Sequence, residues 1–390
     1  MTGGSFALSR WQDVRTLLER TRGWAALHRP YRPAEGLAVL LLLAAVAFPH
    51  EYRPFLPAVL PLALVAPGVS RALALWLATN ALSFLLTPSC TGKVLLLLEG
   101  IFPAVGGNLL GSFFREAKTD VCWVLVGFGW PIALLGLAQW WAAKPAPWAW
   151  LSAAERWLLP TRITGSFGNP NLFAGFLLVL LPLEAGLLLR EERLLRRGLA
   201  TGSLLLHSLV LALTFSHGAW LAAVGTMVLF SLCLQRLRRR ELLTLVALGG
   251  VLAPVLLNHP WGGTLSHRLR IYRGALGLFL KYPLGTGAGG FLAYYPHQAG
   301  AVVAAHCHNI ILQIMVEQGV VGLAVFVYLL LSWFRQGRKL TAPKMAGFLA
   351  LMGGQLLYGV VDYVWATPLL TALFWLAEGY CFGPGEVTPG

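Results

Sequence analysis

The sequence predicts an all-α integral membrane protein with about twelve transmembrane helices. Of its 390 residues, 57% are hydrophobic and only 12% are charged, whereas a soluble domain is about 25% charged. Apolar runs recur along the chain at lengths near the roughly 20 residues that cross a bilayer core of about 30 Å. The basic residues gather in short clusters between these runs, which is typical of polytopic membrane proteins.

The apolar runs follow one another with short connections, apart from two longer ones. They cover 37–48, 55–69, 72–86, 94–110, 121–141, 171–189, 199–215, 219–234, 242–257, 309–334, 345–361 and 368–381. The first 24 residues are polar and Arg-rich, without the apolar core of a signal peptide. We therefore expect the first run to serve as the insertion signal.

The basic clusters predict the orientation. They alternate with loops poor in charge, so they should all lie on one side, the cytoplasm. Both termini are then cytoplasmic, and the two longest connections, 142–167 and 258–308, face outward. Because topology explains the net charge of +14, no nucleic-acid partner is expected. The clusters are the N-terminal arm, Arg71, Arg115 with Lys118, Arg190 to Arg197, Gln235 to Glu241, and Arg335 to Lys339.

The second outer connection contains an amphipathic helical pattern, LSHRLRIYRGALGLFLKYP. A basic face outside the membrane is not explained by the positive-inside rule, and the Arg side chain suits phosphate oxygens. The pattern indicates an anionic ligand at the membrane surface, or contact with anionic headgroups. The apolar face has Leu269, Tyr272, Leu276, Phe279 and Leu280; the basic face has Arg270, Arg273 and Lys281, with Arg268 and His267 at its edge.

Two histidines, His306 and His308, lie where this connection re-enters the membrane. Histidine is the side chain best suited to move a proton near neutral pH, although an uninvolved interfacial pair is the alternative. Their sequence neighbourhood lacks further ligands at zinc-site spacing, so we expect no metal and no cofactor. Glu317 lies deeper in the same run, where an ionisable group is either functional or an interhelical hydrogen-bond partner. Glu99 and Asp362 are similar cases.

Two glycine-rich turns flank the central runs. YPLGTGAGGF predicts a tight outer turn after the amphipathic helix, and GSFGNPN predicts a turn followed by an Asn-capped helix start at Asn169. Backbone amides near Gly165 and Gly168 would be free to face a phosphate.

Four segments together resemble the O-antigen ligase and O-antigen polymerase superfamily of lipid-linked glycan transferases. They are GSFGNPNLFAGFLLVLLPL, FSHGAWLA, RLRIYRGALGLFLKYPLGTGAGGF followed by HNIILQIMVEQGVVGL, and VDYVWATPLLTALFW. The resemblance covers Thr161 to Trp375. It implies a GT-C-like fold with a large external loop between late helices. The expected organisation is a cytoplasmic arm (1–33), N-terminal transmembrane helices with the first external loop (34–160), a ligase-like transmembrane domain (161–381) that includes the external loop 258–308, and a short tail (382–390).

The resemblance also implies an activity in lipopolysaccharide biosynthesis. An undecaprenyl-diphosphate-linked glycan would be transferred, with inversion and without a metal, to a lipid A-core-like glycolipid or another glycan acceptor. The reaction would take place among membrane lipids at the periplasmic face of a bacterial inner membrane. A polymerase of the same superfamily, whose acceptor is a second lipid-linked repeat, is the alternative. A non-catalytic transporter is a second alternative; it would need broken helices and internal repeats.

Residue roles follow from the same resemblance. His308, which precedes Asn309, matches the essential histidine, and Arg268 in the pattern RxxIY matches a diphosphate-binding arginine, with Arg270 and Arg273 beside it. Apart from the resemblance, we expect His306, Asn309 and Glu317 to support the site because of their positions near His308.

One position departs from the family. His217 stands between Ser216 and Gly218 where the family usually has Arg, and a neutral imidazole brings no charge to a diphosphate. Either Arg270 or Arg273 compensates, or the donor differs, or the activity has drifted.

Overall fold

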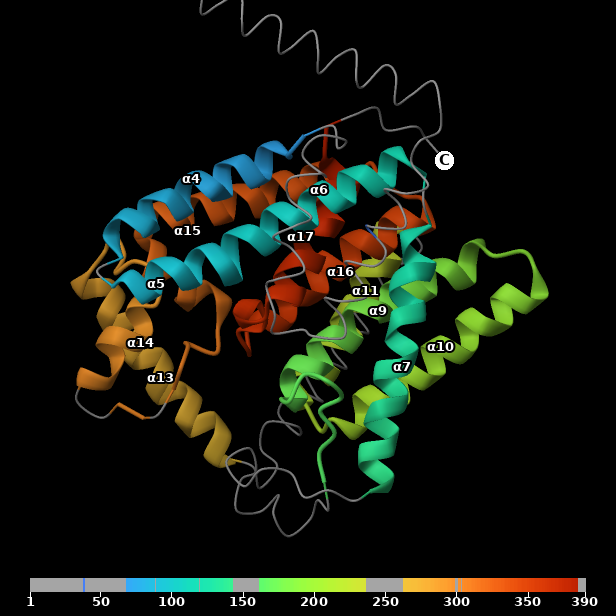
Figure 1. Cartoon of the computed structure of the whole chain (residues 1–390), viewed down its shortest axis with the longest axis horizontal. Helices are drawn as coiled ribbons and strands as arrows, with labels where there is room; N and C mark the ends of the chain where they lie inside the picture. The colour runs from blue at the N-terminus through green and yellow to red at the C-terminus, as the bar shows by residue number, and fades with distance from the viewer. Residues whose placement is uncertain are drawn as a thin grey trace, which may run out of the picture.

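The computed structural model describes residues 38, 68–87, 89–118, 120–142, 161–235, 262–298, 301–302 and 304–384, and these contain helices and no strand. Figure 1 shows the helices assembled into one bundle. Their order is α4 (Arg71–Leu86), α5 (Cys90–Leu95), a π-helical segment (Leu96–Ile101), α6 (Phe102–Glu116), α7 (Val121–Trp141), α9 (Pro170–Arg190), α10 (Leu194–Leu213), α11 (His217–Cys233), α13 (Gly262–Lys281), α14 (Gly290–Tyr294), α15 (Ile310–Gly337), α16 (Pro343–Gly359) and α17 (Pro368–Phe382), with 3-10 turns at Tyr295–His297 and Val364–Ala366.

Four of the described helical segments are long and apolar enough to cross a membrane: Cys90–Glu116, α7, α9 and α15. The helices α4, α11 and α17 are shorter and also apolar. Together with the composition, they identify an integral membrane protein. The apolar runs that fall within the described residues all coincide with helices. The runs 37–48, 55–69 and 242–257 lie almost wholly outside the described residues.

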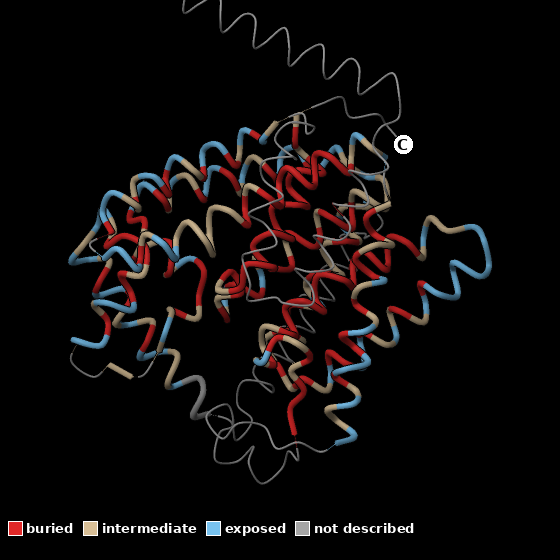
Figure 2. Tube along the Cα trace, in the orientation of Figure 1, coloured by how far each residue is buried: buried red, intermediate tan, exposed pale blue. Residues whose placement is uncertain are grey.

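The centre of the bundle is formed by α9, α16 and α17. Figure 2 shows these helices buried along most of their length, and the most apolar stretch of α9 is 83% buried. The helices α7, α10, α11 and α16 all pack against α9. The surrounding helices therefore shield α9 from lipid.

The helices α6 and α17 approach so closely that only glycine fits between them. A Cβ atom at Gly107 would overlap the carbonyl of Ala372, and one at Gly111 would overlap that of Leu376. Gly379 packs against the Asn108 backbone in the same way. This Gly-xxx-Gly seam is the arrangement that small residues allow where dispersion rather than burial drives helix association in a membrane.

A buried carboxyl ties several of these helices together. Glu378 on α17 is fully buried, and its Oε2 accepts hydrogen bonds at 2.6 Å from both Asn108 Nδ2 and Ser70 Oγ. Trp333 Nε1 on α15 donates to the other oxygen at 3.4 Å. A polar group without water nearby must find partners inside the protein, so this network links α17 to α6, α15 and the start of α4.

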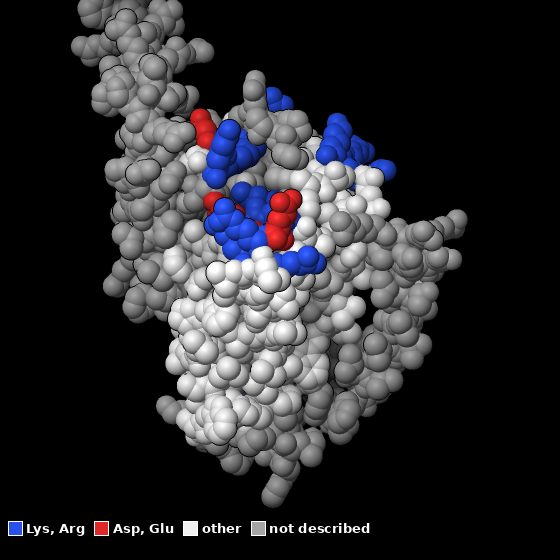
Figure 3. All heavy atoms as spheres, turned by 90° about the vertical axis from the view of Figure 1, so that its right-hand side faces the viewer, with Lys and Arg blue, Asp and Glu red and all other residues white. Residues whose placement is uncertain are grey.

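The basic loops meet at one end of the bundle. Arg190 at the end of α9 is ion-paired with Asp120 before α7, and Lys344 at the start of α16 lies 4.6 Å from the Tyr380 ring of α17. Figure 3, which faces the right-hand end of Figure 1, shows Lys and Arg side chains gathered there. The end of α7, the start of α9 and the end of α16 therefore lie on the other side of the bundle. The helices α11 and α15 begin on that side.

The helix α15 is broken at Gly319, whose φ of 67° is left-handed. The predicted tight turn between α13 and α14 exists and docks against this break. Its backbone supplies hydrogen bonds that the broken helix lacks, namely Thr286 N to Val316 O at 2.8 Å, Gly287 N to Glu317 O at 3.1 Å and Val320 N to Pro283 O at 2.8 Å.

The predicted amphipathic helix is α13, but its packed face differs from the expected one. The buried positions are Ile271, Ala275 and Leu278, whereas Leu269 and Leu280 are 56% and 71% exposed. Spacing alone identifies an apolar stripe without identifying its neighbour.

Candidate active site

The site forms where the end of α16 meets the start of α15. Asn309 caps α15 by accepting hydrogen bonds from the backbone of Ile311 and Leu312 at 2.9 and 3.0 Å. Its Nδ2 also donates to the Val360 carbonyl at 2.8 Å. This residue, expected to support the site, therefore fixes the preceding His308 against the end of α16.

His308 has a left-handed backbone conformation, with φ of 48°. Such a conformation is uncommon for a residue with a side chain and persists where the surroundings hold it. Here Tyr272 on α13 donates a hydrogen bond from its hydroxyl to the His308 carbonyl at 3.1 Å. The direction of the imidazole is thus set by contacts from α13, α15 and α16.

The side chain of His308 pairs with Asp362, which follows α16. Nδ1 of His308 lies 2.9 Å from Oδ1 of Asp362, and the two side chains are 28% and 6% exposed. Tyr363 N donates to the same oxygen at 2.9 Å. Burial by itself raises the pKa of Asp362, but the His308 hydrogen bond and the His308 and Arg268 charges hold this pKa below its usual range. A carboxylate at Nδ1 keeps the proton there and leaves Nε2 as the basic nitrogen.

Of the three arginines expected on the diphosphate, Arg268 alone contacts this pair. Its guanidinium donates to the Val361 carbonyl, and its Nη2 lies 3.7 Å from Oδ2 of Asp362. Arg270 and Arg273 are exposed on α13. Arg268, which was expected at the edge of the basic face, is therefore the arginine that lies beside the pair of His308 and Asp362.

His306 lies directly against His308. The ring centroids are 4.3 Å apart in an edge arrangement, and His306 Nδ1 accepts the backbone N–H of His308 at 3.3 Å. Burial and the nearby His308 charge lower the pKa of His306 to about 4. His306 is therefore neutral near pH 7 and acts as an acceptor.

The structure adds a third potential metal ligand that sequence spacing did not reveal. Donor atoms of His306, His308 and Asp362 lie within 4.8 Å of one another. However, His306 Nδ1 is engaged by a backbone amide, and Asp362 is engaged by both His308 and the cationic Arg268. A divalent cation would have to break these bonds beside a fixed positive charge, so the arrangement fits a hydrogen-bonded triad better than a metal cage.

The turn that contains His217 packs against the same segment after α16. Ser216 Oγ lies 2.9 Å from Tyr358 Oη, and a Cβ atom at Gly218 would lie 2.8 Å from the Val361 side chain. The His217 ring sits edge-on to Trp220 with centroids 4.8 Å apart. The structure thus brings the Ser-His-Gly turn beside the segment that holds Asp362.

Arg162 is a buried cation beside the His217 turn that sequence reasoning missed. It is 8% exposed, and it donates to the carbonyls of Thr214 and Phe215 at 2.9 and 3.2 Å and to Asn171 Oδ1 at 3.2 Å. Tyr358 at the end of α16 donates to the Asn171 carbonyl at 3.1 Å, so Asn171 contacts both Tyr358 and Arg162. The overlooked signal was an arginine on the expected outer side, which the positive-inside rule does not explain.

Two other expectations take a different form in the structure. The Gly165 amide does not face a free site, because it donates to Gln139 Oε1 at 2.9 Å. Glu317 accepts the Gly289 amide at 2.8 Å and so holds the glycine turn at the break in α15. It lies nine residues beyond His308, roughly 13 Å along the helix.

The expected helix cap at Asn169 is confirmed, because its side chain accepts hydrogen bonds from Asn171 N and Leu172 N.

Part of the chain matches a known protein family. Residues 202–327 match the family model described as O-Antigen ligase, which confirms the resemblance to that superfamily. The matched segment contains His217, Arg268 and His308, and stops short of Arg162 on one side and Asp362 on the other. No curated protein matches the chain.

Proposed function

We propose, with the O-antigen ligase domain at residues 202–327 as the premise, that the protein is an inner-membrane glycosyltransferase. It transfers a glycan from undecaprenyl diphosphate to a lipid A-core-like or other glycan acceptor at the periplasmic face. The observation that carries this proposal is the 2.9 Å pair of His308 and buried Asp362, with Arg268 on the same carboxylate. The pair lies away from the basic loops, as an outward-facing site requires.

In the proposed reaction, the acceptor hydroxyl attacks the anomeric carbon of the donor sugar. Its proton passes to Nε2 of His308, while Nδ1–H remains hydrogen-bonded to Asp362, which stabilises the imidazolium that forms. The bond from the anomeric carbon to the diphosphate oxygen breaks, and its electron pair leaves on the diphosphate. A single displacement inverts the configuration, and no metal takes part.

Fixed cations must meet the charge that grows on the leaving diphosphate. Arg268 is held at the site by Val361 and Asp362. Arg162 is held beside the His217 turn, and in this proposal it supplies the charge that His217 does not. Arg270 and Arg273, on the exposed side of α13, would bind the outer part of the diphosphate or a lipid headgroup.

Reconstitution tests this function directly. The purified protein in lipid vesicles receives a labelled undecaprenyl-diphosphate glycan and a lipid A-core acceptor. We expect labelled core together with free undecaprenyl diphosphate. Longer lipid-linked glycan without core labelling would identify the polymerase instead. Movement of the intact donor across the bilayer without either product would indicate a transporter.

A further inference from the structure

A glutamine that the proposed reaction does not use contacts the segment of both histidines, which we call the histidine loop (residues 306–308). The backbone amide of Cys307 donates a hydrogen bond to Oε1 of Gln313 at 2.8 Å. Cys307 is fully buried and Gln313 is only 5% exposed, so water has little access to this amide. A buried backbone N–H needs a partner inside the protein, and Gln313 supplies it.

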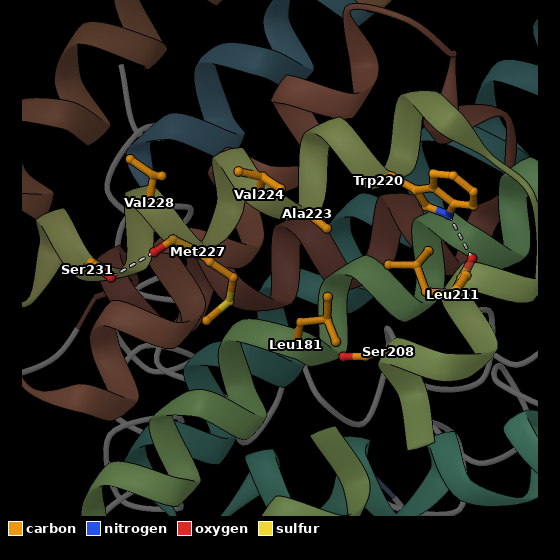
Figure 4. Close-up of a pocket in the computed structure, with 10 residues that line it drawn as sticks. Leu181, Ser208, Leu211, Trp220, Ala223, Val224, Met227, Val228 and Ser231 are labelled. Atoms are coloured by element: carbon orange, nitrogen blue, oxygen red, sulfur yellow. Dashed lines mark hydrogen bonds between the residues drawn. The ribbon is translucent and has the colours of Figure 1, made fainter. Parts of the chain in front are cut away.

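The partner of Gln313 lies outside its own helix. Some polar side chains of the bundle close hydrogen bonds within one helix, as Ser231 does when it donates to Met227 O at 2.9 Å beside the groove along α11 (Figure 4). Gln313 is in the first turns of α15 but reaches back past the cap residue Asn309. In a capping box such a side chain bonds the cap residue itself. Here the bond extends two residues further and enters the histidine loop.

This hydrogen bond bears on the conformation of His308. The peptide unit that Gln313 holds joins His306 to Cys307, and His306 Nδ1 in turn accepts the backbone N–H of His308 at 3.3 Å. The left-handed φ of 48° at His308 persists only while the surrounding structure holds it. Gln313 therefore acts on His308 through the two residues that precede it.

A second side chain of the same helix face anchors the other end of this part of the chain. Glu317 lies four residues after Gln313, and residues at this spacing are neighbours on a helix surface. Glu317 accepts the Gly289 amide of the glycine turn at 2.8 Å. The chain between Gly289 and Cys307 is thus tied at both ends to the part of α15 that precedes the break at Gly319.

We infer that Gln313 is a positioning residue for His308. Its side-chain oxygen holds the histidine loop in the conformation in which His308 pairs with Asp362. This inference rests on the proposed function for its effect on transfer and adds a residue that acts through the histidine loop. A glutamine that only stabilised α15 would change the stability of the protein but not the transfer rate of the folded molecules.

The test compares two substitutions at position 313 with a matched control. Gln313→Met keeps the length of the side chain without the acceptor oxygen, and Gln313→Glu keeps an acceptor. Gln318→Met is the control, because Gln318 is a second buried glutamine of α15, and its Nε2 lies 3.5 Å from Asn80 Oδ1 on α4. We expect Gln313→Met to lower kcat per folded protein about tenfold or more with KM changed less than about twofold. Gln313→Glu and Gln318→Met should keep kcat within about fivefold of the wild-type value.

The conformation of the histidine loop is measured separately, through the thiol of Cys307. The protein in detergent is treated with a maleimide, and mass spectrometry follows the labelling of the peptide that contains Cys307. The exposed Cys90 of the same molecule gives the reference rate. We expect Gln313→Met to label Cys307 about tenfold or more faster than the wild-type protein, because the loop opens locally once its anchor is lost. Gln313→Glu and Gln318→Met should label it at nearly the wild-type rate.

A wild-type labelling rate of Cys307 in Gln313→Met, or an equal acceleration in Gln318→Met, would overturn the inference. Faster labelling of Cys307 with undiminished transfer would also overturn it, because the histidine loop would then move without consequence for His308. If the wild-type protein shows no transfer, the labelling comparison still decides whether Gln313 holds the histidine loop. Absent transfer with labelling that depends on Gln313 would refute the proposed reaction and retain the anchoring of the loop.

Discussion

Single residues at the candidate active site are held by contacts from three helices. His308 is fixed through its backbone by Tyr272 and Asn309 and through its ring by Asp362. His306 touches the same residue but uses its Nδ1 to accept a backbone amide. The two histidines therefore differ in what their imidazoles can do, although they are two positions apart.

The first prediction separates these histidines. His308→Ala should reduce glycan transfer by about 10²–10⁴-fold, the usual contribution of a general base. His306→Ala should reduce it less than about tenfold, because His306 only positions its neighbour. The rates are measured in membranes at matched expression, and the melting temperature of each variant controls for misfolding. Wild-type transfer by His308→Ala would exclude His308 as the base.

The second prediction ranks the arginines of α13. Arg268→Ala should slow transfer about ten- to a hundredfold, because a charge-assisted hydrogen bond contributes about 1.5–3 kcal/mol. Arg268→Lys should also be impaired, since an ammonium group lacks the planar fork that reaches both Val361 O and Asp362. Arg270→Ala and Arg273→Ala are the matched controls and should lose less than about fivefold. Equal losses at all three positions would show that a general basic surface matters.

The third prediction concerns pH. The pKa of His306 falls to about 4 in the folded protein from an ordinary value near 6.5. Between these values the unfolded chain binds more protons at this position, so the free energy of unfolding decreases as the pH is lowered. We expect the melting temperature in detergent to drop between pH 7 and pH 5. His306→Gln should recover about 2–4 °C of this drop relative to the wild-type protein. A wild-type pH profile in His306→Gln would contradict the assignment.

At the scale of helices, close packing relies on glycine in two places. Gly319 breaks α15 and admits the glycine turn that Glu317 holds. Gly107 and Gly111 bring α6 against α17 beside the buried Glu378 network. The α6–α17 contact joins segments that are far apart in the sequence, whereas the turn that docks at Gly319 lies shortly before α15 in the chain.

The fourth prediction compares the change in stability that a Gly→Ala substitution causes at two positions. At Gly111 a methyl group would overlap the Leu376 carbonyl, and Gly111→Ala should destabilise the protein by about 1–3 kcal/mol. At Gly127 on α7 a Cβ meets nothing among the described atoms within 4 Å, so Gly127→Ala should be neutral or stabilise by up to about 1 kcal/mol. Thermal unfolding in detergent distinguishes them. A similar change in melting temperature for both variants would argue against a tight seam.

At the scale of the whole molecule, the basic loops and the candidate active site lie at opposite ends of the bundle. The ion pair of Arg190 with Asp120 marks one end, and the pair of His308 with Asp362 marks the other. Figure 1 shows α13 and α14 on the far side from the loop that joins α9 and α10. The proposed transfer at the outer face would require this separation.

The fifth prediction tests the orientation. A reporter inserted after Glu192, in the loop between α9 and α10, should read as cytoplasmic, because basic loops are retained inside. A reporter inserted after His297, in the segment that follows α14, should read as periplasmic. Dual reporters that are active on opposite sides of the membrane provide the measurement. Reversed signals would put the candidate active site on the cytoplasmic face and exclude the proposed donor.

The sequence by itself determined the membrane class, the helices in the described residues and the identity of His308 as the chief candidate. These features are local: apolar length, charge clusters and short motifs can be recognised without knowing what each residue contacts. The Gly-xxx-Gly pattern of Gly107 and Gly111 could have been recognised in the same way and was overlooked.

Only the tertiary structure decided which groups meet. Asp362 lies 54 positions from His308, and Asp362 and Arg162 each belong to segments that no spacing rule connects to the histidines. The packed face of α13, and with it the choice of Arg268 over Arg270 and Arg273, was equally undetermined. The physical reason is that lipid and protein interior are both apolar surroundings, so periodicity in a membrane chain shows where an apolar face lies but not whether lipid or another helix covers it.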